Sequence, residues 1–172
     1  LNKGMKMSKS KNNTINPDDI IKKFGADTLR VFIIFAAPPD QNLEWSDSAI
    51  EGAHKFLKRL WALSYSVINK KNNESIKEDK NENQLDSTIL KKKIHSTIKK
   101  VTSDIFDRKS LNTAIAAMME LLKELIRFNS KCLYADNILV DGIKSLLKML
   151  SPIAPHLTHK IWFEFNNKIP IM

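Results

Sequence analysis

Residues 110–125 read SLNTAIAAMMELLKEL, and apolar side chains recur among them every three or four positions. This spacing is typical of one face of an α-helix rather than of a half-buried strand. The apolar positions are Leu111, Ala114, Ile115, Met118, Leu121, Leu122 and Leu125. Because so wide an apolar face needs other helices to cover it, the stretch indicates a helical bundle.

The flanking sequence provides candidate partner helices. Helical spacing extends from near Ser46 to Ile68, from Leu90 to Ile105 and from Ile138 to Leu150. A last helix is expected to open at Ser151-Pro152 and to run through Trp162. We therefore predict a mainly α fold built around a helical bundle.

Two short helices are expected before the bundle. The first begins at Asn16-Pro17, where asparagine caps and proline suits the first helical position, and it ends at Gly25. The second is expected to be capped by Asp27 and to end at Pro38-Pro39. Between the two parts of the chain, Leu43–Trp45 is the only plausible strand, and the polar segment 69–84 is predicted to be a loop.

Composition limits the class of protein. The 172 residues are 42% hydrophobic, which is enough for a real core, and one cysteine, Cys132, excludes an internal disulfide framework. The longest apolar run, Val31–Ala37, is far too short to cross a bilayer. We expect a cytoplasmic protein, with an organellar matrix as the alternative, and the start at Leu1 suggests a piece of a longer chain.

The net charge of +9 at pH 7 is unevenly distributed. Residues 1–13 carry +4 without any acid, and residues 85–109 carry another +4. Two local concentrations of positive charge favour partners that carry phosphate groups.

The first of these concentrations contains Lys6-Met7-Ser8-Lys9-Ser10, with Gly4 just before it. Ammonium groups neutralise phosphate charge, and hydroxyl and backbone N–H groups donate to phosphate oxygens. Such a loop is therefore suited to a polyphosphate, although composition alone favours a solvated basic tail.

This pentapeptide matches the KMSKS signature of class I aminoacyl-tRNA synthetases, and the following residues resemble the leucyl-tRNA synthetase branch of that family. The similar segments are 9–13, 16–17, 24–30, 36–39, 43–46, 51–61, 111–121 and 151–157. Two departures are Thr14, where relatives often have glycine, and His159-Lys160, where they often have two acids. The resemblance covers nearly the whole chain apart from residues 69–84.

The resemblance implies part of a ligase that uses ATP to activate leucine and transfers it to tRNA(Leu). In such an enzyme Lys9 would be the first candidate to contact ATP and the departing pyrophosphate, and Lys6 the second. Met7, Ser8 and Ser10 would complete the catalytic loop. Mg²⁺ is expected to accompany ATP in the intact enzyme, and no metal site is expected in this segment. Leucine would be held by a core that the segment lacks, so the segment alone should be inactive.

The resemblance also divides the chain into residues 1–46, the loop with the end of the catalytic domain, and residues 47–172, an anticodon-binding-type bundle. The basic residues assigned to tRNA binding are Lys91, Lys92, Lys93, Lys99 and Lys100. A merely solvated helix face is the alternative for them. A monomer is expected, with no membrane partner.

Other candidate residues have structural explanations. His156 and His159 lie three positions apart, but without further ligands His156 is better explained by a helix start. Trp45, Trp61 and Trp162 are expected in the core rather than as base-stacking platforms. Two other functions stay open: a class I synthetase for isoleucine, valine or methionine, and a non-enzymatic helical module that binds RNA or protein.

Overall fold

The computed structural model describes residues 5–8, 10, 13–38, 41–73, 84–131, 137–165 and 170–171. Within these ranges the chain forms seven helices, which confirms the predicted mainly α fold. They are α1 (Pro17–Phe24), α2 (Ala26–Ala36), α3 (Asp47–Asn73), α4 (Gln84–Phe106), α5 (Leu111–Lys131), α6 (Asn137–Leu150) and α7 (Pro155–Glu164). None of the described helices is both long and apolar enough to cross a membrane.

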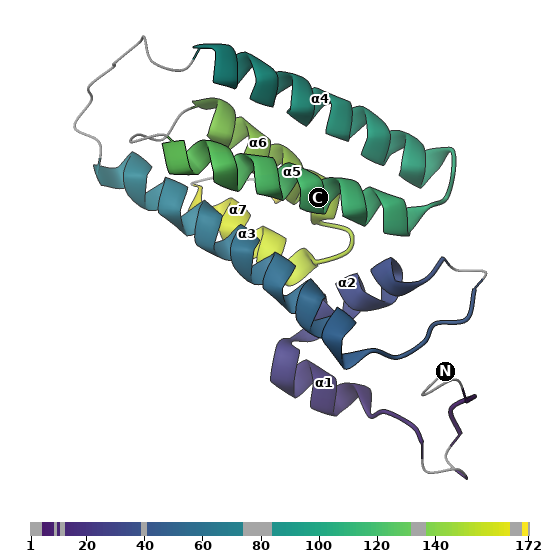
Figure 1. Cartoon of the computed structure of the whole chain (residues 1–172). Helices are drawn as coiled ribbons and strands as arrows, with labels where there is room; N and C mark the ends of the chain where they lie inside the picture. The colour runs from purple at the N-terminus through teal and green to yellow at the C-terminus, as the bar shows by residue number, and fades with distance from the viewer. Residues whose placement is uncertain are drawn as a thin grey trace.

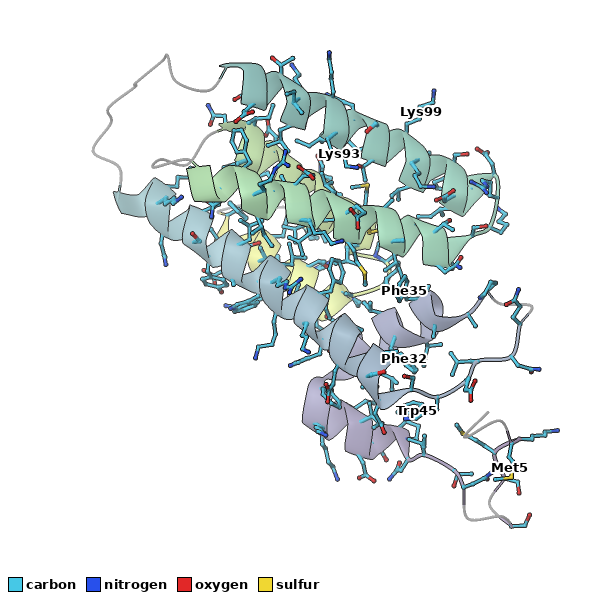
Figure 2. All side chains as sticks on the ribbon, in the orientation of Figure 1. Met5, Phe32, Phe35, Trp45, Lys93 and Lys99 are labelled. Atoms are coloured by element: carbon cyan, nitrogen blue, oxygen red, sulfur yellow. The ribbon has the colours of Figure 1, made fainter. Side chains whose placement is uncertain are left out.

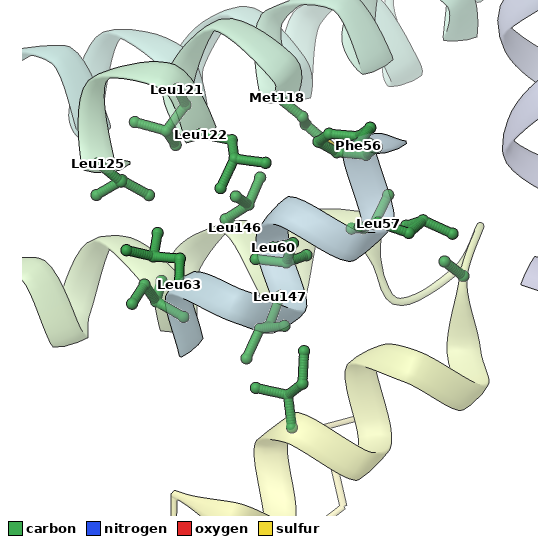
Figure 3. Packing of buried hydrophobic residues seen from close by; sticks show 14 of the residues in the cluster. Phe56, Leu57, Leu60, Leu63, Met118, Leu121, Leu122, Leu125, Leu146 and Leu147 are labelled. Atoms are coloured by element: carbon green, nitrogen blue, oxygen red, sulfur yellow. The ribbon is translucent and has the colours of Figure 1, made fainter. Parts of the chain in front are cut away.

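The helix α5, whose sequence predicted the fold, lies at the centre of the molecule and contacts α2, α3, α4 and α6 (Figure 1). The outer helix α4 packs on α5 and α6, while α7 packs on α3 and α6. Leucines of α3, α5 and α6 meet in the core, as Figure 3 shows for Leu60, Leu121 and Leu146, which are fully buried. Burial of these apolar faces is the main stabilising contribution to the bundle.

The two short helices lie at one end of the bundle, and α2 joins α1 to α3, α5 and α7. The Asn16 side chain accepts a hydrogen bond from the Asp18 backbone N at 3.1 Å, as its capping role predicts. Gly25 ends α1 with φ of 87°, and its N–H donates to the Ile21 carbonyl at 2.8 Å. Only glycine adopts this backbone conformation without strain.

The predicted cap of α2 is wrong. The helix begins at Ala26, so Asp27 lies inside the first turn, and Gly25 occupies the capping position without a side-chain hydrogen bond. The Asp27 carboxylate instead reaches α7, where it accepts the backbone N–H of Leu157 at 2.7 Å. A tertiary contact has therefore replaced the local one.

Two predicted segments end differently in the structure. Helix α3 continues to Asn73 and α4 begins at Gln84, so residues 69–73 and Gln84 are helical, while residues 74–83 lie outside the described part. Within the added part of α3, Lys70 is held by α5, because its Nζ donates to Asn129 Oδ1 at 2.8 Å. The last helix begins at Pro155 rather than Ser151, since residues 151–154 form a turn in which the N–H groups of Ile153 and Ala154 both donate to the Leu150 carbonyl.

The predicted strand at Leu43–Trp45 is an irregular connection. The Trp45 ring packs edge-on against Phe32 of α2, with 5.1 Å between ring centroids. Its Nε1 donates to Asp47 Oδ1 at 3.0 Å. Packing of the Trp45 ring against α2 therefore fixes the end of this segment, and Figure 2 shows the two labelled side chains close to each other.

Candidate functional site

The predicted phosphate-binding loop is partly described. Lys6 and Ser10 are exposed, Met7 and Ser8 are half-buried, and Lys9 lies outside the described residues. The hydroxyl oxygens of Ser8 and Ser10 are 2.8 Å apart, within hydrogen-bond distance. The loop thus presents one described ammonium group and two adjacent hydroxyls, which are the groups that donate to phosphate oxygens.

Asn13 holds this loop and was missed as a site residue. Its Oδ1 accepts the Ser8 backbone N–H at 2.8 Å, and its Nδ2 donates to the Lys6 carbonyl at 3.2 Å. Asparagine commonly bonds nearby backbone in this way, so its residue type was the available signal. The side chain thus bridges the backbones of Lys6 and Ser8 and limits the conformations of both residues.

The loop lies at the end of the molecule where α1 lies, whereas α4 lies along the opposite side (Figure 1). The structure therefore keeps the loop and the predicted RNA-binding lysines apart. An arrangement of this kind suits two separate anionic groups better than one small ligand.

The five predicted lysines of α4 do not form one uniform face. Lys91, Lys92 and Lys99 are exposed, and Figure 2 shows Lys99 projecting away from the bundle. Lys93 is half-buried and lines a cleft of about 290 Å³ between α4 and α5 with Glu124 and other residues. The exposed lysines are available to a polyanion, whereas Lys93 faces a neighbouring helix.

Lys100 forms an ion pair with another residue of α4. Its Nζ lies 3.0 Å from Asp104 Oδ2, and Arg108 Nη1 lies 3.2 Å from Oδ1 of the same carboxylate. Burial of Asp104 acts against its charged form, but hydrogen bonds from Lys100 and Thr113 and the charges of Lys100 and Arg108 outweigh it. The pKa of Asp104 is therefore lowered, and the carboxylate stays ionised with Lys100 as its partner.

The two histidines do not form a metal site. His156 Nδ1 lies 2.8 Å from Asp27 Oδ1, and the His159 ring packs against Phe163. His156 does stand at a helix start, as predicted, but its side chain is 74% exposed. Among the residues that the structure describes, no group of three or more His, Cys, Asp or Glu side chains could hold a metal ion.

The expectation that all three tryptophans belong to the core is wrong for Trp61. Trp45 and Trp162 are partly buried and pack against the core, whereas Trp61 is 38% exposed. Its ring is tilted by 30° over Tyr65, one turn further along α3, with 4.5 Å between centroids. The helical spacing correctly put Trp61 near the apolar face of α3. It did not predict how far the large ring extends beyond that face into solvent.

Comparison with known proteins supports both parts of the chain. The family model of the anticodon-binding domain of tRNA ligases matches residues 86–172, and the model of class I tRNA synthetases for I, L, M and V matches residues 1–46. The chain is 44% identical over 168 residues to the leucine–tRNA ligase of Thioalkalivibrio sulfidiphilus, covering 98% of the chain and 20% of the relative. It is 48% identical over 167 residues to the leucine–tRNA ligase of Acinetobacter baumannii, covering 95% and 19%.

A solved structure has the same fold. The LeuRS of Agrobacterium radiobacter, in its ternary complex with tRNA and LeuAMS, superposes with a TM-score of 0.81 at 27% identity. That alignment covers 98% of this chain and 22% of the other. The chain thus spans about a fifth of the length of the curated relatives that it matches. From the matched family models, the likeness over nearly all of this chain and the shared fold, the chain belongs to the leucyl-tRNA synthetase family.

Proposed function

We propose that this chain is the part of a leucine–tRNA ligase that contacts ATP with one end and tRNA(Leu) with the other. The observation that carries the proposal is that the Lys6–Ser10 loop and the helical bundle occur in one continuous match to leucine–tRNA ligases. Their order along the chain is also that of the two family models.

The chemistry of the loop supports a role in leucine activation. The leucine carboxylate attacks the α-phosphate of ATP, the bond to the β-phosphate breaks, and pyrophosphate leaves with increased negative charge. A lysine that meets these oxygens best in the transition state lowers the barrier without holding the substrate too tightly. We assign this role to Lys9 by its place in the motif and a supporting one to Lys6, with Ser8 and Ser10 as hydrogen-bond donors.

The chemistry of α4 supports a role in orienting tRNA. Lys91, Lys92 and Lys99 are exposed and lie along a helix, as contacts with a phosphate backbone require. Such contacts fix the orientation of a nucleic acid without reading its sequence. We therefore assign these three lysines to backbone contact, whereas Lys93 and Lys100 add positive charge nearby without a direct phosphate contact.

The remaining assignments belong to the whole ligase. We propose a cytoplasmic, monomeric enzyme in which Mg²⁺ accompanies ATP and in which leucine is held by the rest of the catalytic domain. We place the boundary between catalytic and tRNA-binding parts after residue 46, and the end of the class I family match at residue 46 supports that position.

Leucine-dependent exchange of pyrophosphate with ATP tests the proposal in the full-length ligase that contains this segment. Wild-type enzyme is expected to exchange with leucine and not with isoleucine, valine or methionine. Lys9→Ala is expected to lower the exchange rate by about a hundredfold or more, while the leucine dissociation constant stays nearly unchanged. Near-normal exchange in Lys9→Ala would contradict the role of the loop.

Suitable controls are Lys9→Arg, which keeps the positive charge, and Lys22→Ala, which changes an exposed surface residue. Lys22 is an exposed residue of α1 outside the loop, so its loss should leave exchange unchanged. A preference for another aliphatic amino acid would contradict leucine as the substrate while leaving the reaction class intact.

A further inference from the structure

Asp27 of α2 makes its polar contacts with a helix far along the chain. Its Oδ2 accepts the Leu157 backbone N–H at 2.7 Å, and its Oδ1 lies 2.8 Å from His156 Nδ1. Asp27 is buried, and His156 lies at the protein surface. The carboxylate therefore joins α2 to the first turn of α7.

Helix α7 has no side-chain cap at its own N-terminus. The residue before it is Ala154, which makes no side-chain hydrogen bond to the helix. Leu157 is the third residue of α7, and an N–H at that position has no acceptor within the helix. Asp27 provides the missing acceptor, and its negative charge suits the positive end of the helix.

The same turn of α2 is also attached to α3. The Thr28 hydroxyl donates to the Phe24 carbonyl at 2.7 Å and lies 3.3 Å from His54 Nδ1. Just before this turn stand Gly25 and α1, which follow the loop that contains Lys6 and Ser8. The first turn of α2 is therefore one of the places where the loop-bearing end of the chain is fixed to the bundle, besides the packing of α2 on α3 and α5.

We propose that Asp27 is a positioning residue, which holds the ATP-contacting loop in register with the tRNA-binding bundle through its joint with α7. This proposal rests on the proposed function. Loss of the Asp27 contacts leaves the side chains of the loop unchanged, but it lets the position of the loop relative to the bundle vary. Since the loop acts mainly in the transition state, such variation lowers kcat rather than the affinity for leucine.

Three variants of the full-length ligase test this role. Asp27→Ala removes both contacts, and kcat for leucine-dependent ATP–pyrophosphate exchange is expected to fall by about tenfold, with the KM for leucine changed by less than about twofold. Asp27→Asn keeps an oxygen that can accept the Leu157 N–H and an amide that can donate to His156 Nδ1. This variant is expected to recover most of the rate.

Thr158→Val is the matched control. The buried Thr158 hydroxyl donates to the Ala154 carbonyl at 2.8 Å, so this variant loses a hydrogen bond at the same end of α7 and keeps both groups that bond to Asp27. Its kcat is expected to stay within about twofold of wild type. A fall equal to that of Asp27→Ala would overturn the positioning role, because stability of α7 alone would then explain both.

Amide hydrogen exchange of the same full-length variants gives a readout that does not depend on activity. Asp27→Ala is expected to accelerate exchange in α1 and α2, while Asp27→Asn and Thr158→Val leave it near wild type. Unchanged exchange in Asp27→Ala would overturn the proposal. A wild-type enzyme that does not activate leucine would contradict the proposed function instead, and active wild type with an equally active Asp27→Ala would contradict only the positioning role.

Discussion

The Lys100 ammonium group lies 3.0 Å from Oδ2 of Asp104, a carboxylate that is 1% exposed, while the lysine itself stays 50% exposed. Lys99 is its neighbour in sequence and is exposed on the same helix without lining the α4–α5 cleft. Two adjacent lysines of one predicted binding set therefore differ in their contacts. Lys100 pairs with a buried carboxylate, and we propose that Lys99 is the one of the two that contacts a phosphate.

Lys99→Ala is expected to weaken binding of tRNA(Leu) and to reduce the slope of log affinity against log salt concentration by about one, because one phosphate contact is lost. Lys100→Ala is expected to leave that slope nearly unchanged and to lower the stability of the chain instead. Fluorescence anisotropy with labelled tRNA over a series of KCl concentrations measures both slopes. Equal losses of slope in the two variants would contradict the separation.

The lowered pKa of Asp104 makes the stability of the chain depend on pH in a defined direction. Because the folded state favours the charged carboxylate, its contribution is present above the unfolded pKa of about 3.8 and is lost as the pH falls through the lower, folded pKa. Asp104→Asn is expected to lower the free energy of unfolding at pH 7 by about 1–3 kcal/mol, because Lys100 and Arg108 lose the buried negative charge with which they pair.

Urea unfolding of both proteins between pH 7 and pH 2 measures this difference. The free energy of unfolding of wild type should approach that of Asp104→Asn as the pH falls below the folded pKa. A difference that is constant over this range would show that ionisation of Asp104 does not contribute.

At Gly142, α6 passes close to buried side chains of α4 and α5. A Cβ built there would lie 2.6 Å from Leu125 Cδ2 and 2.9 Å from Ile94 Cδ1, and both of these side chains are buried. Gly142→Val is expected to destabilise the chain by about 1–3 kcal/mol, because two packed side chains must move. Gly52, which has no neighbour within 4 Å of a built Cβ, provides the control: Gly52→Ala should be neutral or stabilising. Thermal unfolding of both variants checks this.

The bundle could be predicted because its helices carry repeated local signals. Apolar spacing located α3, α4, α5 and α6, and capping residues such as Asn16 and Gly25 located the ends of α1. Local signals did not predict the role of a residue where a contact with a distant helix determines it. Asp27 looks like the cap of its own helix, but its acceptor oxygens serve α7.

The candidate site shows the same division. A short motif indicated the loop, because residue types within a few positions of each other carry the signal. The bridge made by Asn13 and the pairing of Lys100 with Asp104 depend on side-chain geometry, which spacing alone does not give. The helical wheel likewise places Lys93 among the polar residues, although in the structure it faces the cleft beside α5.

Trp45 and Trp61 offer a direct test of where tryptophan stabilises this fold. Trp45 packs on Phe32 and donates to Asp47, so Trp45→Ala removes both a ring contact in the core and a hydrogen bond, and it should cost about 3 kcal/mol. Trp61 contacts Tyr65 at the surface, and Trp61→Ala should cost about 1 kcal/mol or less because much of the ring is already in water. Chemical denaturation of the two variants gives the comparison. If Trp61→Ala were as costly as Trp45→Ala, Trp61 would have to be buried in solution, and the original assignment of both rings to the core would be restored.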